Sequence, residues 1–148
     1  MVKLALLTML SLTPLAAAEF TLTIGNPIAA NMPRMKTASL AVRLENCADL
    51  SKASLTGTAE GLAAGARKSV PLQVVAGTIP GVYAIAQFVP LEGAWVADLK
   101  ATCGNDKAGA IVPFRGAAFL RDSVKVLPRF AQTVEIDRAL KDLSGGPK

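Results

Sequence analysis

Alternating apolar and polar residues predict that most of this chain folds into β-strands. The clearest run is 94–103, where every odd-numbered residue is apolar and the even-numbered residues include Val96, Asp98 and Lys100. Such alternation is typical of an antiparallel sheet with one buried side and one side in water. We therefore expect the odd-numbered residues to face a core and Asp98 to face solvent beside Lys100.

Weaker runs of the same kind predict further short strands. Pro71 would place its strand at a sheet edge, because proline cannot donate to a central ladder. Ile79-Pro80-Gly81 has proline and glycine where a type II turn requires them. Strands at roughly 10-residue spacing with turns between them favour a β-sandwich. The predicted strands are 20–24, 39–45, 54–60, 69–74, 82–88, 94–103, 110–114 and 119–127.

The end of the chain follows a helical period instead. Ile136, Leu140 and Leu143 recur at the spacing of one helix face, Thr133 is a candidate N-cap, and Gly145 supplies a stop. The sequence therefore predicts a sandwich domain over 19–130, followed by a C-terminal helix and tail over 131–148.

Residues 1–18 have the three parts of a secretory signal peptide. Lys3 gives a positive charge, 4–15 an apolar segment, and three alanines a cleavage site before Glu19. An uncleaved membrane anchor is the alternative, although a spanning helix needs roughly 20 apolar residues and this run is shorter. We expect a periplasmic or secreted protein with no transmembrane anchor after cleavage.

Cys47 and Cys103 are the only cysteines, and in an exported protein they predict one disulfide. The chain-entropy model assigns about 4 kcal/mol to a loop of this size. Cys47 lies one residue out of the inward period of its strand, so a bulge or turn near Asn46 must redirect its side chain. A redox-active or metal-binding pair is the alternative, without a C-x-x-C spacing to favour it.

Gly81-Val82-Tyr83 and Gly93-Ala94-Trp95-Val96 resemble the G-x-Y … G-x-W signature of bacterial immunoglobulin-like modules. The segment is similar to the paired strands of exported FixH-type and YtkA-like domains. The resemblance implies an all-β fold, an immunoglobulin-like antiparallel β-sandwich with a short C-terminal α-helix. Trp95 shares its strand with Cys103, unlike antibody domains, so the likeness concerns architecture. These families offer no catalytic residues to transfer.

The amino-acid composition limits which catalytic and metal sites the chain can form. The chain has 148 residues, 16 Lys and Arg against 11 Asp and Glu, a net charge of +5, and no histidine. Without histidine, Ser-His-Asp and Cys-His nucleophile systems and imidazole metal sites are excluded. The positive charge is spread along the chain and predicts no nucleic-acid footprint. No motif indicates a cofactor, and an enzyme of unknown type would require an acidic pair converging in a pocket.

Two surfaces could carry a binding function. Met32 and Met35 offer thioether ligands that suit Cu(I), which gives a periplasmic copper-handling protein as one alternative; the other interpretation is that they only fill a packing gap. Basic side chains could instead meet an unknown envelope protein or an anionic surface, although such charges also serve solvation and edge protection. We therefore expect an exported, non-enzymatic binding or accessory module. The basic residues are Arg67, Lys68, Arg115, Arg121, Lys125 and Arg129.

Overall fold

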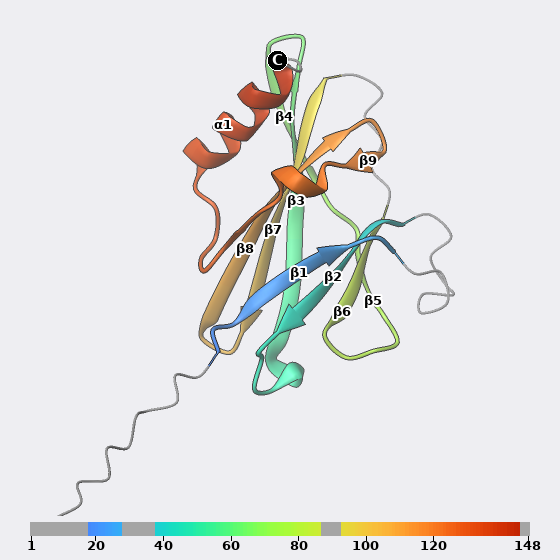
Figure 1. Cartoon of the computed structure of the whole chain (residues 1–148), viewed down its shortest axis with the longest axis vertical. Helices are drawn as coiled ribbons and strands as arrows, with labels where there is room; N and C mark the ends of the chain where they lie inside the picture. Colours follow the sequence, from blue (N-terminus) through green and yellow to red (C-terminus); the bar gives the residue numbers. More distant parts are fainter. Residues whose placement is uncertain (1–17, 28–37, 87–92, 146–148) are drawn as a thin grey trace, which may run out of the picture.

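Two β-sheets and one helix stack in three layers (Figure 1). The computed structural model describes residues 18–27, 38–86 and 93–145. Within those residues the strands pair antiparallel throughout, and a helix occurs at the C-terminal end. The predicted all-β sandwich with a short C-terminal α-helix is therefore confirmed.

The first sheet has four strands in the order β1-β2-β6-β5. Their bounds are Thr21–Gly25 for β1, Ala38–Glu45 for β2, Val82–Ala86 for β6 and Val74–Ala76 for β5. Neighbours in space are thus not always neighbours in sequence, because β3 and β4 belong to the other sheet. The chain therefore crosses from the first sheet to the second after β2 and returns after β4.

The second sheet has six strands, in the order β10-β8-β7-β3-β4 with β9 paired to β8. Together the two sheets match the immunoglobulin arrangement: the first, second, sixth and fifth strands on one side, and the fourth, third, seventh and eighth on the other. The bounds are Ala53–Ala63 for β3, Ala66–Pro71 for β4, Ala94–Cys103 for β7, Asp106–Arg115 for β8, Ala118–Phe119 for β9 and Lys125–Leu127 for β10.

The main core fills the space between the sheets. Leu40 and Val42 of β2 pack in the same cluster as Leu99 of β7 and Val112 of β8, and all four side chains are fully buried. Ala97, Leu99, Ala101 and Cys103 of β7 belong to this core, as their alternation predicts. Period-two patterning therefore identified the inner face of the second sheet correctly.

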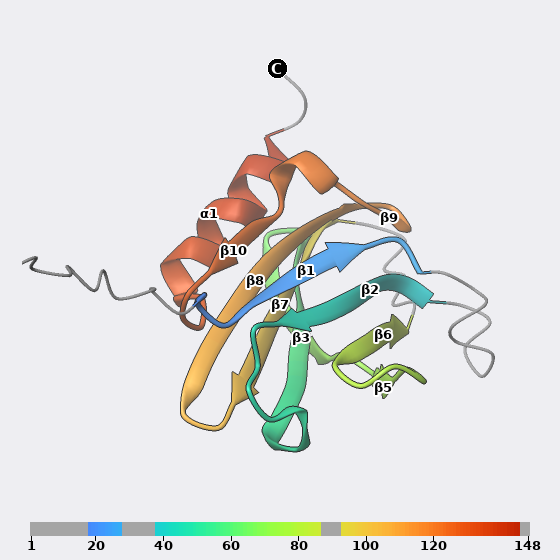
Figure 2. The same cartoon turned by 60° about the horizontal axis from the view of Figure 1, so that its bottom comes forward.

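The outer face of the second sheet carries a second core, which strand alternation alone does not predict. Helix α1 (Thr133–Ser144) packs its residues Ile136 and Leu140 against Val96 of β7 and Ile111 of β8. Figure 2 shows α1 on the side of β7 and β8 away from β1 and β2. The prediction that the Asp98 face of β7 lies in water is therefore wrong.

The start of α1 also differs from the prediction. Its N-cap is Gln132, and Gln132 and Glu135 form a reciprocal capping box. The Gln132 backbone N–H donates to the Glu135 carboxylate at 2.8 Å. Thr133 is instead the first helical residue. Serine, threonine, aspartate and asparagine are the usual N-cap residues, so the sequence pattern favours Thr133 over Gln132.

The predicted strand 69–74 is two strands in different sheets. β4 ends at Pro71 and β5 begins at Val74, and between them the Leu72 N–H donates to the Gly57 carbonyl at 3.0 Å. β4 is the last strand of its sheet, which confirms the edge position that Pro71 predicts. The continuous apolar alternation hid the crossover.

Two predicted turn features are confirmed. Gly81 has φ 81°, and the Val82 N–H donates to the Ile79 carbonyl at 3.1 Å, as in a type II turn. Asn46 has φ 61°, a left-handed conformation that turns the chain just after β2. That turn redirects Cys47 toward the second sheet.

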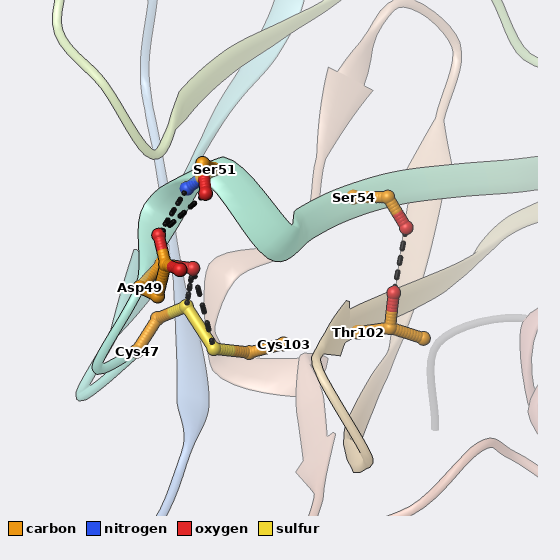
Figure 3. Close-up of a disulfide and its surroundings, with 6 residues drawn as sticks. All are labelled: Cys47, Asp49, Ser51, Ser54, Thr102 and Cys103. Atoms are coloured by element: carbon orange, nitrogen blue, oxygen red, sulfur yellow. Dashed lines mark hydrogen bonds between the residues drawn. A yellow bond between two sulfur atoms is a disulfide. The ribbon is translucent and has the colours of Figure 1, made fainter.

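Cys47 and Cys103 form the predicted disulfide, with Cα atoms 5.8 Å apart (Figure 3). The bond joins the end of β2 in one sheet to the end of β7 in the other. The Asp49 carbonyl oxygen lies 3.3 Å from the Cys47 sulfur, a close contact and not a hydrogen bond, since a disulfide sulfur has no proton. The Ser51 hydroxyl and then the Ser51 backbone N–H donate to the Asp49 carboxylate, and these hydrogen bonds lower the pKa of Asp49.

Candidate functional site

A groove of about 790 Å³ lies between α1 and the uncovered part of the outer face of the second sheet. It exists because α1 covers only part of that face. Its lining combines apolar, hydroxyl and charged side chains from β3, β4, β7 and α1. The residues are Thr58, Glu60, Leu62, Gly65, Arg67, Ser69, Asp98, Lys100, Ala131, Thr133, Ile136, Asp137 and Leu140.

Glu60 is the centre of a hydrogen-bonded network on the sheet. Its Oε1 accepts hydrogen bonds from the hydroxyls of Thr58 at 2.7 Å and Ser69 at 2.8 Å, and its Oε2 lies 3.5 Å from Nη2 of Arg67. Strand pairing accounts for this geometry, because Ser69 of β4 lies directly opposite Glu60 of β3. The carboxylate is thus fixed in orientation by two strands.

Arg67 links the sheet to the helix. Its guanidinium pairs with Glu60 on one side and with Asp137 of α1 on the other. Since Arg67 belongs to the edge strand and Asp137 to the helix, this bridge spans the groove. The Arg67 and Asp137 side chains are 36% and 57% exposed, so their ion pair contributes more to the shape of the groove than to folding stability.

Asp98 is the one buried charged residue among those that the structure describes, with 4% of its surface exposed. Its Oδ2 lies 3.7 Å from the Lys100 ammonium, whereas Oδ1 has no hydrogen-bond partner among the described residues. Burial raises the pKa of Asp98, the negative charge of Glu60 raises it further, and Lys100 opposes both effects. The groove therefore contains an acid that is incompletely paired.

Lys100 has a second partner available. Its side chain is 42% exposed, and its ammonium lies 6.0 Å from the centre of the Phe130 ring. Lys107 of β8 lies over the same ring at 5.3 Å. The Lys100 ammonium can therefore move away from Asp98 without losing all favourable electrostatic contact.

The charges of the groove do not cancel. Glu60, Asp98 and Asp137 supply three carboxylates, whereas Arg67 and Lys100 supply two cations. A net negative groove on a chain of charge +5 favours a cationic or neutral polar ligand over an anion. Among the described residues, no group of three or more Asp, Glu, His or Cys could hold a metal ion.

The structure disperses part of the predicted basic surface. Arg67 lies in the groove, and Lys68 beside it is exposed on β4. Arg129 makes a two-pronged ion pair with Glu135, with contacts of 2.8 and 2.9 Å, which lowers the pKa of Glu135 to about 2. Arg121 lies over the Phe119 ring, 5.5 Å from its centre.

Two of the basic residues line the same pocket. Arg115 and Lys125 line a smaller pocket of about 280 Å³, together with Asp142 of α1 and apolar residues that include Pro113 and Leu143. An anionic partner at this pocket stays a prediction. Met32 and Met35 and the signal segment up to residue 17 lie outside the described residues.

Glu60 and Asp98 are site residues that the sequence pattern does not predict. The alternation of the strand alone assigns Asp98 to water, because the helix that covers this face is distant in sequence. One signal was present in the sequence: Val96 is a large apolar residue on the predicted wet face of its strand, and the apolar stripe of the C-terminal helix needed a surface to cover. Comparisons with models of protein families, with curated proteins and with solved structures found no match.

Proposed function

We propose that this chain is an exported, non-enzymatic binding module of the bacterial cell envelope, and that it binds its ligand in the groove beside α1. The observation that carries the proposal is the arrangement of Glu60, Arg67 and Asp98 in one ligand-sized groove. A concave site with a few convergent polar groups on an apolar wall is the usual form of a small-molecule site.

The fold supports a binding role by holding these groups still. Glu60 is oriented by hydrogen bonds from Thr58 and Ser69, and all three residues are on paired strands of one sheet. Sites built on strands and helices keep their geometry better than sites on loops. A ligand would therefore meet a site that is already assembled, which reduces the entropy lost on binding.

Export is supported by two independent features. Residues 1–18 have the pattern of a signal peptide, and Cys47 forms a disulfide with Cys103, a bond that persists in oxidising compartments. Within residues 18–27, 38–86 and 93–145, no helix is long and apolar enough to cross a bilayer. The periplasm or the cell exterior is the proposed location.

A second candidate function has one observation in its favour. Glu60 and Asp98 are two carboxylates in the same groove, and their charges interact. An acidic pair of this kind could act as general acid and base in a hydrolase. A screen for hydrolysis of glycosides and esters separates the two functions, because the binding module predicts no turnover that depends on Asp98.

The binding proposal is tested by a thermal-shift screen of polar small molecules on the disulfide-bonded chain. Compounds that bind in the groove should raise the melting temperature of the wild type, and Glu60→Gln should reduce that increase. Glu45→Gln is the matched control, since Glu45 also accepts a hydroxyl hydrogen bond, from Thr23, but lies on the first sheet. Ligands that stabilise both variants equally, or no ligands at all, would contradict the proposal.

A further inference from the structure

We propose that the ligand of the groove is a small alkylamine, and that its protonated ammonium binds Asp98 in place of Lys100. This inference rests on the proposed binding function and names the chemical class of the ligand. It follows from three properties of the groove: an incompletely paired buried carboxylate, a displaceable internal cation, and an apolar wall.

The carboxylate of Asp98 has unused capacity to accept hydrogen bonds. Oδ1 is buried without a partner among the described residues, and the 3.7 Å separation between Oδ2 and the Lys100 ammonium is too long for a good hydrogen bond. A buried acceptor without a hydrogen bond is energetically costly. A ligand that donates to such an acceptor therefore gains more binding free energy than a ligand that donates to an acceptor already hydrogen-bonded.

A primary ammonium matches the acceptors that converge at this point. Thr58 lies directly opposite Asp98 in the strand register, and its hydroxyl proton is directed to Glu60, which leaves the oxygen lone pairs free to accept. The two Asp98 oxygens and the Thr58 oxygen thus offer three acceptors for three N–H donors. Charge-assisted bonds of this type are about twice as strong as neutral ones.

Lys100 acts as an occupant that the ligand displaces. Its ammonium has Phe130 as an alternative partner at 6.0 Å, and its side chain is already 42% exposed. Moving it outward exchanges a loose ion pair for a cation–π contact and hydration. The ligand then restores the charge balance beside Asp98.

The body of the ligand should be an alkyl chain. Leu62, Ile136 and Leu140 form an apolar wall next to the charged groups. Such a wall stabilises methylene groups, at about 0.8 kcal/mol for each CH₂ that is buried. The three carboxylates of the groove disfavour an alkyl carboxylate of the same size.

The test compares butylamine, butanol and butyrate by NMR titration of the disulfide-bonded, ¹⁵N-labelled chain at neutral pH. Butylamine should bind in the groove, whereas its neutral and anionic counterparts should bind at least about tenfold more weakly, as loss of a charge-assisted hydrogen bond predicts. Asp98→Asn should weaken butylamine binding by about the same factor. Asp106→Asn, which removes the same charge from the exposed β7–β8 hairpin, should leave it unchanged.

Lys100→Met provides a second test that does not depend on the folding of the Asp98 variant. Because Lys100 competes with the ligand, its removal should tighten butylamine binding several-fold. Lys107→Met is the matched control, since Lys107 also lies over Phe130 but does not pair with Asp98. Unchanged or weaker binding in Lys100→Met, or an equal gain in both variants, would overturn the alkylamine proposal.

The outcomes also separate this inference from the function on which it rests. If butylamine fails to bind but a neutral or anionic compound binds in a Glu60-dependent way, the ligand class is wrong and the binding function stands. If neither these three probes nor the polar compounds of the thermal-shift screen bind in the groove, both are wrong.

Discussion

Cys47 and Cys103 connect the two sheets of the sandwich at the ends of β2 and β7. The two cysteines are 56 residues apart in sequence, so the bond strongly restricts the conformations of the unfolded chain. We predict that reduction lowers the free energy of unfolding by up to about 4 kcal/mol. Thermal melts with and without reductant measure this, with a free-thiol count on the unfolded, unreduced chain as the check. Two reactive thiols or an unchanged melt would contradict the prediction.

The buried carboxylate of Asp98 should make stability depend on pH. Its folded pKa is raised above the ordinary value of 3.8, mainly by burial, so the folded chain binds the proton more tightly than the unfolded chain. This contribution is fully present below pH 3.8 and is lost as the pH rises through the raised pKa. Asp98→Asn should therefore be more stable than the wild type at neutral pH, with a difference that shrinks in acid.

Urea unfolding between pH 3 and pH 7 measures that difference. Asp106→Asn is the control, because Asp106 is exposed at the start of β8 and its loss changes net charge without relieving burial. A stability gap for Asp98→Asn that is constant across the range would show that the carboxyl does not titrate differently in the folded chain.

Glu135 should make stability depend on pH in the opposite direction to Asp98. Its pKa is lowered to about 2, first by the hydrogen bonds from Arg129 and then by the Gln132 backbone. Its contribution is present above the ordinary value of 4.5 and is lost as the pH falls toward 2. Glu135→Gln should remove this acid-side loss in a urea series extended down to about pH 2. If the wild type and Glu135→Gln lose the same stability as the pH falls, the ion pair with Arg129 does not stabilise the start of α1.

Helix α1 should be a stabilising part of the domain and not an appendage. Leu140 is fully buried between α1 and the second sheet, together with Ile136 and Val96. Leu140→Ala should lower the free energy of unfolding by about 2–5 kcal/mol, the range for truncation of a buried leucine. Val134→Ala is the control on the same helix, because Val134 is 57% exposed and should change stability little. Equal effects of the two substitutions would mean that α1 does not pack as described.

The parts of the fold that sequence could predict depend on local pattern. The inner face of β7, the turn at Gly81 and the redirected backbone at Asn46 all follow from alternation, turn chemistry and the need to orient Cys47. The split between β4 and β5 does not follow from local pattern. Apolar alternation continues across Pro71, although the chain changes sheets there.

The groove could not be predicted for a related reason. Its residues come from β3, β4, β7 and α1, and only the docking of α1 on Val96 and Ile111 turns an open sheet face into a wall. Asp98 is polar and alternates correctly, so local pattern assigns it to solvent. Burial of such a residue depends on contacts between segments that are distant in sequence.

The proposed function requires that the groove beside α1 is the ligand site of an exported module. NMR spectra of the ¹⁵N-labelled, disulfide-bonded chain, titrated with the low-molecular-weight fraction of a periplasmic extract, test it directly. We expect shifts of amides around Glu60, Arg67 and Asp98 that are reduced by Glu60→Gln and kept in Glu45→Gln. Shifts centred on the pocket of Arg115 and Lys125, or on the first sheet, would contradict it.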